Sequence, residues 1–150
     1  MHVDIMRGLP GSGKSFWAKV RMSQAKGVGV IVSADNYFMR DGVYTFNPSR
    51  ITEAHDDCLG RFIKAVDKGN DYITVDNTNI HAWEIAPYYR LAEHYGYSVQ
   101  VVQVNTPLTT CMKRQTHGVP ELTMGMMYAN LQREVLPKYW KVYQIDGVLK

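Results

Sequence analysis

Apolar and polar positions along the chain alternate between two patterns. Short runs rich in β-branched residues, which are typical of strands, occupy residues 3–6, 28–32, 72–75, 99–104 and, more weakly, 142–145. Longer segments with a helical pattern lie between them, at residues 14–26, 48–68, 81–95, 107–114 and 120–135. This alternation predicts an α/β fold, in which a parallel sheet of about five strands carries helices on both faces.

Polar residues and prolines mark the ends of several predicted helices. Asn47 precedes Pro48, so we expect Asn47 to be an N-cap and Pro48 to take the first helical position. Thr106 is expected to cap the helix that follows it. Pro87 either kinks or begins the helix that contains it, because proline cannot donate the helical backbone hydrogen bond.

Polar segments follow the first three predicted strands. A glycine-rich loop comes after the first strand, Ser33–Asp35 after the second, and Asp76–Asn79 after the third. Ligands of open parallel sheets bind outside the carboxyl ends of the strands. We therefore expect these three segments to meet at one edge of the sheet.

The glycine-rich loop carries a phosphate-binding pattern. Its sequence GLPGSGKS, at residues 8–15, fits G-x-x-x-x-G-K-[ST]. Glycines permit positive φ, so that successive N–H groups can surround a phosphate chain. The phosphates of ATP are expected to contact Leu9, Pro10, Gly11, Ser12, Gly13, Lys14 and Ser15, and Mg²⁺ is expected to contact Ser15 as well. The alternative is a glycine turn that happens to precede a helix.

Length, charge and cysteine content narrow the class of protein. The 150 residues fit one domain over residues 1–150, and the formal charge of +3 permits an anionic substrate without requiring one. Cys58 and Cys111 are expected to be free thiols in a reducing compartment. The sequence has neither a signal-peptide core nor an apolar run of about 18 residues, so we expect a cytoplasmic or nuclear protein without membrane contact.

The rest of the sequence favours a small P-loop kinase over other phosphate-loop proteins. The guanine-reading pattern N-K-x-D is absent. The stretch Asp57–Gly60 fits the GTPase pattern D-x-x-G, but it lies inside a helical pattern where it cannot act as a switch. A motor ATPase usually needs a longer chain. A small kinase needs a group that activates the acceptor hydroxyl and a mobile basic lid.

Acidic residues at the predicted strand ends are candidates for catalysis and metal binding. Asp35 ends the second strand, where it can accept the proton of an incoming hydroxyl; the alternative is a helix cap. Asp76, after the third strand, is the Mg²⁺ candidate. Asn79 is expected to line the acceptor site or to cap the next helix.

The lid is predicted at about residues 113–121, as a small helical element. Lys113 and Arg114 end one helix, and a Gly-Val-Pro hinge precedes the next. Arg114 is expected to stabilise the transferring phosphoryl group, and Lys113 to contact ATP. The alternative is that both cations complement a helix C-terminus. Arg7, before the loop, is expected to be solvated rather than to touch phosphate.

These motifs together resemble a known family. The resemblance rests on RGLPGSGKS, SADNYF, DGVYTFNP, EAH, DNTNIHAWE, PYYRLAEHYGY and THGVP, in this order from about residue 3 to residue 139. They are similar to the P-loop polynucleotide 5′-hydroxyl kinase group, and within it to the kinase-like domain of a ubiquitin-ligase-binding protein and its short relatives. The resemblance implies an ATP- and Mg²⁺-dependent kinase acting on the 5′-hydroxyl end of DNA or RNA. It implies phosphate and metal roles for Lys14 and Ser15, a general base in Asp35 and a lid arginine in Arg114.

Two positions depart from the phage polynucleotide kinase of that group. Phe38 stands where the phage enzyme has an arginine that helps to hold the acceptor phosphate. His117 and Gly118 stand in the region of its second lid arginine. Arg40 lies nearby and is retained as a substrate-binding candidate.

The departures keep three functions open. The first is a polynucleotide 5′-hydroxyl kinase, the second a kinase of small molecules such as nucleosides, nucleotides or other metabolites, and the third a non-catalytic ATP-binding module. Several aromatic residues after the second strand bear on the choice. They either stack on a base or form a small apolar core: Tyr37, Phe38, Tyr44 and Phe46.

Overall fold

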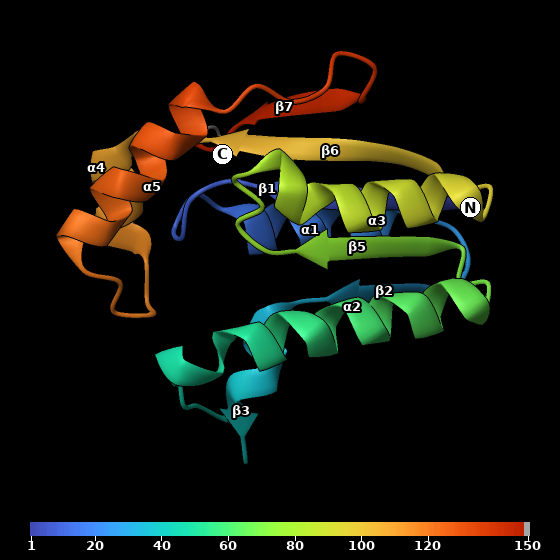
Figure 1. Cartoon of the computed structure of the whole chain (residues 1–150), viewed down its shortest axis with the longest axis horizontal. Helices are drawn as coiled ribbons and strands as arrows, with labels where there is room; N and C mark the ends of the chain where they lie inside the picture. Colours follow the sequence, from blue (N-terminus) through green and yellow to red (C-terminus); the bar gives the residue numbers. More distant parts are fainter. Residues whose placement is uncertain (149–150) are drawn as a thin grey trace.

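Five parallel strands form the centre of the molecule, which a computed structural model describes over residues 1–148. They are β1 (His2–Arg7), β2 (Gly29–Val32), β5 (Tyr72–Asp76), β6 (Ser98–Asn105) and β7 (Val142–Asp146). Their order across the sheet is β2–β5–β1–β6–β7, and all their carboxyl ends lie at one edge (Figure 1). The predicted five-stranded parallel sheet is therefore confirmed.

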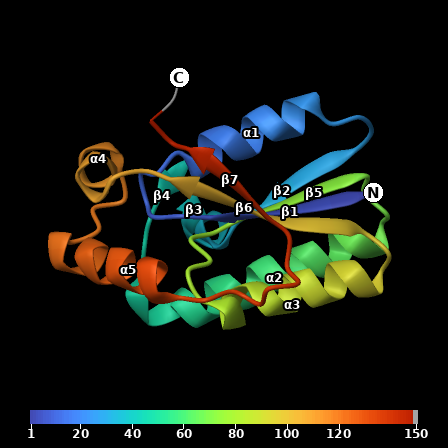
Figure 2. The ribbon, with the colours of Figure 1, turned by 90° about the horizontal axis from the view of Figure 1, so that it is seen from above.

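Helices cover both faces of this sheet, as predicted. α1 (Lys14–Gln24) packs on one face, and α2 (Ile51–Asp67) and α3 (Ala82–His94) pack on the other (Figure 2). α4 (Leu108–Arg114) and α5 (Glu121–Arg133) lie beyond the carboxyl edge (Figure 1). Within residues 1–148, no helix combines the length and the apolar character that a membrane span requires.

The core lies on both sides of β1, because helices cover the sheet on both sides. Val3 and Ile5 belong to the cluster that β1 shares with α2 and α3, whereas Met6 packs with Ala18 of α1. A separate cluster between α4 and α5 includes Leu9 of the glycine-rich loop. One apolar side chain therefore anchors this loop to the helices beyond the sheet edge.

A hairpin that the hydrophobic pattern does not predict follows β2. The short 3₁₀ helix η1 (Ala34–Phe38) leads into the two-residue strands β3 (Met39–Arg40) and β4 (Val43–Tyr44). Asp41 and Gly42 connect these strands with φ values of 50° and 79°, and Asp-Gly is the preferred sequence for such a two-residue turn. Strands this short leave no alternation to detect, so the Asp-Gly pair is the only local signal for the hairpin.

The predicted helix ends are partly confirmed. Asn47 caps the turn that leads into α2, and its Oδ1 accepts a hydrogen bond from the backbone N–H of Ser49 at 3.1 Å. The cap prediction for Thr106 is wrong: its hydroxyl donates to the carbonyl oxygen of Ser12 at 2.7 Å instead. Pro87 lies inside α3 and does not begin it.

A carboxylate is buried in the middle of the sheet. Asp4 of β1 is fully buried and accepts hydrogen bonds from His2 and from Arg21 of α1, each at 2.7 Å, and from the hydroxyl of Tyr72. Burial alone would raise the pKa of Asp4, but these hydrogen bonds outweigh it and hold the pKa at about 2, below the ordinary 3.8. The ionised carboxylate thus ties α1 to β1.

The Asp4 cluster predicts a loss of stability in acid. The pKa of Asp4 is lower in the folded than in the unfolded chain, so its ionised form stabilises the fold above about pH 4, and this contribution disappears as the pH falls towards 2. The lost free energy of unfolding is on the order of 2 kcal/mol. Urea unfolding from pH 6 to pH 2.5 measures it.

Asp4→Asn should lower the free energy of unfolding at pH 6 and flatten its decline below pH 4. Asp56→Asn, which changes an exposed carboxylate on α2, is the control and should retain the decline. An Asp4→Asn protein with the same acid dependence as wild type would contradict the assignment.

Candidate active site

The glycine-rich loop runs from the end of β1 to the start of α1 and is fixed by main-chain contacts. The N–H of Gly8 donates to the carbonyl oxygen of Thr78 at 3.0 Å, which joins the loop to the segment after β5. Gly11 has φ 80° and packs so closely on α4 that a Cβ there would lie 2.3 Å from the carbonyl oxygen of Cys111. Gly13, with φ 102°, is the N-cap of α1. Both residues therefore require glycine, one for space and both for conformation.

Lys14 is enclosed by the loop and faces two carboxylates. Its Nζ donates to the carbonyl oxygen of Leu9 at 3.1 Å. Burial of the ammonium group lowers the pKa of Lys14, and the negative charges of Asp76 and Asp35 oppose this shift. The structure therefore brings Lys14 and the two carboxylates singled out from the sequence to one place at the sheet edge.

Ser15 and Asp76 form the pair that was expected to hold Mg²⁺. The Ser15 hydroxyl donates to Oδ2 of Asp76 at 2.7 Å. Hard oxygen donors of this kind suit Mg²⁺, which usually takes one or two protein ligands and completes its shell with water and phosphate oxygens. No group of three or more His, Cys, Asp or Glu side chains within residues 1–148 is arranged to hold a metal. The residues present thus fit an ion held jointly with a bound triphosphate.

The Asp35 side chain does not cap the 3₁₀ helix η1 that contains it. Ser33 is the N-cap of η1, and its hydroxyl accepts the N–H of Asp35 at 3.2 Å, so the alternative role of Asp35 as a cap is excluded. The Asp35 side chain is 54% exposed. Its Oδ1 accepts a hydrogen bond from the Tyr44 hydroxyl at 3.3 Å, and its Oδ2 lies 3.7 Å from Nδ1 of His117. The carboxylate is therefore available to a ligand in the cleft.

Arg114 reaches the phosphate loop, whereas Lys113 does not. A cavity of about 240 Å³ is lined by Arg114 together with Lys14, Ser15 and their neighbours in the loop. Nη1 of Arg114 donates to the carbonyl oxygen of Gly147, after β7, at 3.0 Å. Lys113 is exposed and does not line this cavity.

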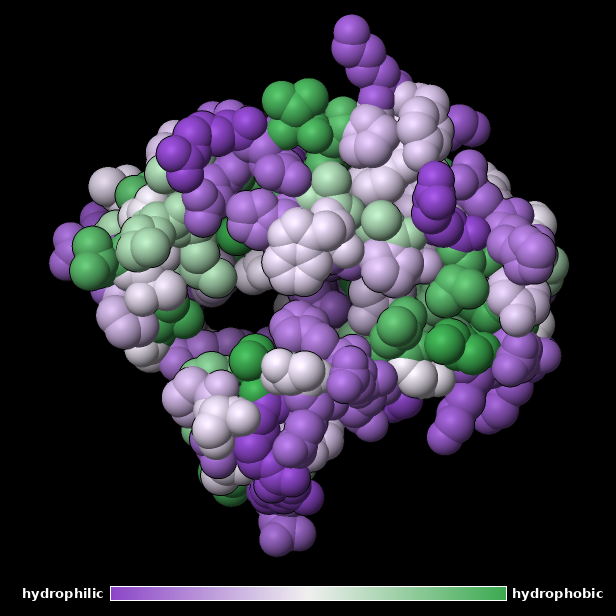
Figure 3. All heavy atoms as spheres, in the orientation of Figure 1, coloured by the Kyte–Doolittle hydropathy of each residue, from purple (hydrophilic) through white to green (hydrophobic). Residues whose placement is uncertain are grey.

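The predicted lid is a loop between two helices rather than a helical element. α4 ends at Arg114 and α5 begins at Glu121, and the residues between them form no helix. Figure 3 shows the surface hollowed between these helices and the hairpin. The predicted phosphate-binding residues and the predicted acceptor-activating residue Asp35 thus lie around an open cleft.

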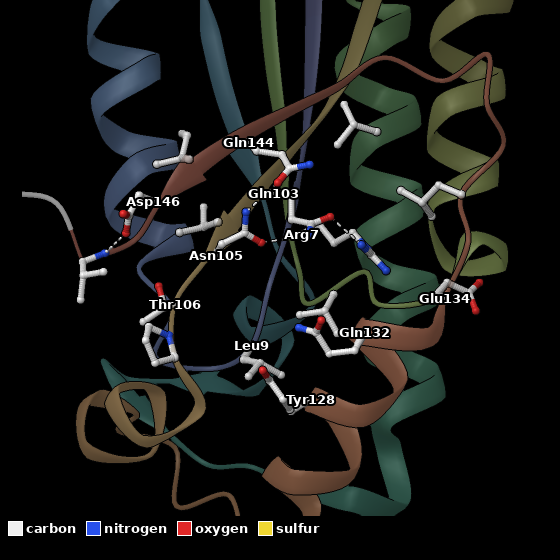
Figure 4. Close-up of a pocket in the computed structure, with 17 residues that line it drawn as sticks. Arg7, Leu9, Gln103, Asn105, Thr106, Tyr128, Gln132, Glu134, Gln144 and Asp146 are labelled. Atoms are coloured by element: carbon white, nitrogen blue, oxygen red, sulfur yellow. Dashed lines mark hydrogen bonds between the residues drawn. The ribbon is translucent and has the colours of Figure 1, made fainter.

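Two expectations about polar residues at the sheet edge are not met. Asn79 is 2% exposed and its Nδ2 donates to the carbonyl oxygen of Met6 at 2.8 Å, so its side chain braces β1 and does not line an acceptor site. Arg7 is 3% exposed instead of solvated. Its guanidinium donates to the carbonyl oxygens of Asn79 and Ile80. It also donates to Oε1 of Gln103 (Figure 4). Arg40, the other substrate candidate, is exposed on the hairpin.

A second, larger cavity lies between β6, β7 and α5. It measures about 980 Å³, and amide side chains cross its floor (Figure 4). Nε2 of Gln103 donates to Oδ1 of Asn105, and Nδ2 of Asn105 donates to Oε1 of Gln144, each at 2.9 Å. Leu9 is the only phosphate-loop residue in its lining. This cavity is therefore separate from the site around Lys14.

The sequence did not predict which residues surround Asp35. Tyr44 and Phe46 are aromatic residues that it left between base stacking and an apolar core, and His117 was noted only as a departure from a lid arginine. The structure stacks the rings of Tyr44 and His117 at 4.3 Å between centroids and 16° between planes. Contact between residues 73 positions apart leaves no local pattern, so no signal in one sequence reveals it.

The parallel sheet, the phosphate loop and the Ser15–Asp76 pair define a P-loop kinase fold. The chain matches the family described as an AAA domain over residues 3–117 and belongs to that family. NEDD4-binding protein 2 of Homo sapiens is 36% identical over 135 residues, which are 87% of this chain and 8% of that protein. The 2′,3′-cyclic-nucleotide 3′-phosphodiesterase of Pongo abelii is 29% identical over 144 residues, 91% of this chain and 32% of that protein. The chain thus spans a minor part of each of these relatives.

Solved structures support the fold assignment. A chain of the Pnkp1/Rnl/Hen1 RNA repair complex aligns with a TM-score of 0.66 at 19% identity, over 88% of this chain and 45% of that one. A sugar kinase from Janibacter sp. HTCC2649 gives 0.68 at 16%, over 100% and 87%. The Mycobacterium tuberculosis APS kinase CysC, in complex with AMPPNP and APS, gives 0.62 at 18%, over 99% and 90%. At these identities the alignments establish the fold alone.

The packing of the loop predicts a selective effect of one glycine substitution. Gly11→Ala should move α4 or the loop, because its Cβ cannot fit beside Cys111, and should weaken Mg²⁺-ATP binding in calorimetry. Gly42→Ala is the matched control: its φ is 79°, but no heavy atom lies within 4 Å of the added Cβ. We expect Gly11→Ala to lose about 1–3 kcal/mol more stability than this control. Equal nucleotide affinities in the two variants would contradict the packing argument.

Proposed function

We propose that the protein is an ATP- and Mg²⁺-dependent phosphotransferase that transfers the γ-phosphoryl group of ATP to a hydroxyl. The observation that carries this proposal is the convergence of Lys14, the Ser15–Asp76 pair and the exposed Asp35 at one edge of the sheet. Nucleotide binding alone would explain Lys14 and the Ser15–Asp76 pair. It does not explain a carboxylate that is half-exposed and free of a capping role beside them.

The transfer is an in-line displacement. Asp35 accepts the proton of the acceptor hydroxyl, whose oxygen forms a bond to the γ-phosphorus while the bond to the β,γ-bridging oxygen breaks and ADP leaves. Lys14 and Arg114 stabilise negative charge on the phosphoryl oxygens. Ser15 and Asp76 would hold Mg²⁺, which would neutralise part of the negative charge of the phosphates.

The acceptor that we propose is the 5′-hydroxyl end of DNA or RNA. The order and spacing of the motifs, which resemble those of the polynucleotide 5′-hydroxyl kinase group, favour it. Phe46 is exposed beside Tyr44, and Arg40 projects from the same hairpin. An exposed aromatic ring and a cation suit the bases and phosphates of a single strand.

A small-molecule acceptor is the second candidate. Phe38 is 3% exposed and packs in the core, so its side chain cannot hold an acceptor phosphate. The aligned folds include a sugar kinase and an APS kinase. A screen of ATP consumption against small hydroxyl compounds decides the matter, because activity there without transfer to oligonucleotides would replace the polynucleotide assignment.

Asp35→Asn should lower transfer of labelled γ-phosphate to 5′-hydroxyl oligonucleotides by ~10²–10⁴-fold, the usual effect of a general base. Its affinity for Mg²⁺-ATP should stay close to that of wild type. Asp41→Asn, at the hairpin turn, is the matched control and should retain transfer, since asparagine tolerates its positive φ. Failure of wild type to phosphorylate DNA or RNA of any length would reject the acceptor, and an active Asp35→Asn protein would reject the base.

Lys14→Ala separates the enzyme from a non-catalytic ATP-binding module. If Lys14 stabilises the transferring charge, its loss should reduce turnover by ~10²-fold or more. Circular dichroism checks that the fold survives. A wild-type turnover that does not exceed the Lys14→Ala background would favour the non-catalytic module.

A further inference from the structure

Tyr44 and His117 form a ring stack across the cleft, directly beside Asp35. Tyr44 belongs to the hairpin and His117 to the loop between α4 and α5. Their rings lie 4.3 Å apart at 16°, and each residue also places a polar atom near a different oxygen of the Asp35 carboxylate. The stack therefore lies against the carboxylate that we assign as the base and leaves about half of it exposed.

The Tyr44 side of this stack is rigidly supported. Phe38, which is buried, packs edge-on against the Tyr44 ring, and the Phe46 ring lies nearly parallel to it. The N–H and the hydroxyl of Thr45 both donate to the carbonyl oxygen of Phe38, which fixes the hairpin against η1. The face of Tyr44 is thus a preformed aromatic surface.

The loop that carries His117 is held weakly at His117 and firmly at its two ends, Gln115 and Val119. The amide of Gln115 bonds both backbone groups of Val119, donating to the carbonyl oxygen at 3.2 Å and accepting from the N–H at 3.1 Å. His117 stands at the tip of this braced loop with a side chain that is 40% exposed. A single exposed contact of 3.7 Å between the His117 ring and Asp35 contributes little, so a ligand can displace the tip without unfolding the loop.

We propose that the face of Tyr44 now covered by His117 is the subsite for the terminal nucleobase of the acceptor, and that the His117 ring holds its place in the free protein. This inference rests on the proposed function. A ring cannot enter between Tyr44 and His117, because two successive contacts of about 3.5–4 Å need roughly twice the present separation. The base therefore replaces His117 on Tyr44, which brings the adjoining 5′-hydroxyl to Asp35.

The place-holder role makes opposite predictions for the two partners of the stack. Tyr44→Ala removes the surface on which the base stacks, so it should weaken acceptor binding by ~10-fold or more. His117→Ala removes only the competitor, so it should strengthen binding several-fold. Tyr44→Phe keeps the ring and loses the hydrogen bond to Asp35, so it should stay close to wild type.

Fluorescence polarisation of labelled trinucleotides measures these acceptor affinities without requiring phosphoryl transfer. One probe carries a base on its 5′-hydroxyl nucleotide and the other is abasic at that position; both are measured with Mg²⁺ and AMPPNP. Wild type should prefer the base-bearing probe, Tyr44→Ala should lose the preference, and His117→Ala should increase it. His55→Ala, an exposed histidine on α2, is the control and should bind as wild type does.

The outcomes separate this inference from the proposed function. Equal binding of the two probes by wild type, or weaker binding of the base-bearing probe by His117→Ala, would overturn the subsite even if transfer occurs. The expected pattern of affinities without any phosphoryl transfer would support the subsite and reject the catalytic proposal.

Discussion

The main-chain N–H groups of the glycine-rich loop have to converge on the place where a phosphate chain would bind, and the packing around the loop holds them in that orientation. Gly8 bonds to the segment after β5, the carbonyl oxygen of Ser12 accepts a hydrogen bond from Thr106 at the end of β6, and Gly11 is pressed against α4. These three neighbours come from distant parts of the chain. The geometry at Lys14 is therefore a property of the whole carboxyl edge of the sheet rather than of the glycine pattern alone.

The donor half of the site was largely predictable because its roles are local. A glycine loop between a strand and a helix fixes where Lys14 and Ser15 point, and a carboxylate at the end of a neighbouring parallel strand has to lie close to them. The same regularity made the five strands and the main helices recognisable. Asp35 could be placed at the sheet edge for that reason, although its freedom from capping became evident only with Ser33 in view.

The remaining roles depend on contacts between residues far apart in sequence, which one sequence does not encode in any readable pattern. Arg7 was expected to be solvated, as arginines at strand ends usually are, but the segment after β5 offers its guanidinium two carbonyl oxygens. Thr106 and Asn79 are residue types that often cap helices. Instead, Thr106 donates to a carbonyl oxygen of the glycine-rich loop, and Asn79 donates to a carbonyl oxygen of β1. The β3–β4 hairpin is too short to show alternation, and so the surroundings of Asp35 were missed.

The clamp formed by Arg7 has a mechanical consequence. One buried guanidinium joins the segment after β5 to β1 and, through Gln103, to β6, so the three central strands are cross-linked where the phosphate loop begins. The β3–β4 hairpin has no such tie to the sheet and pairs only with itself. The clamp thereby lets the nucleotide-facing half keep its shape when an acceptor strand enters beside the hairpin.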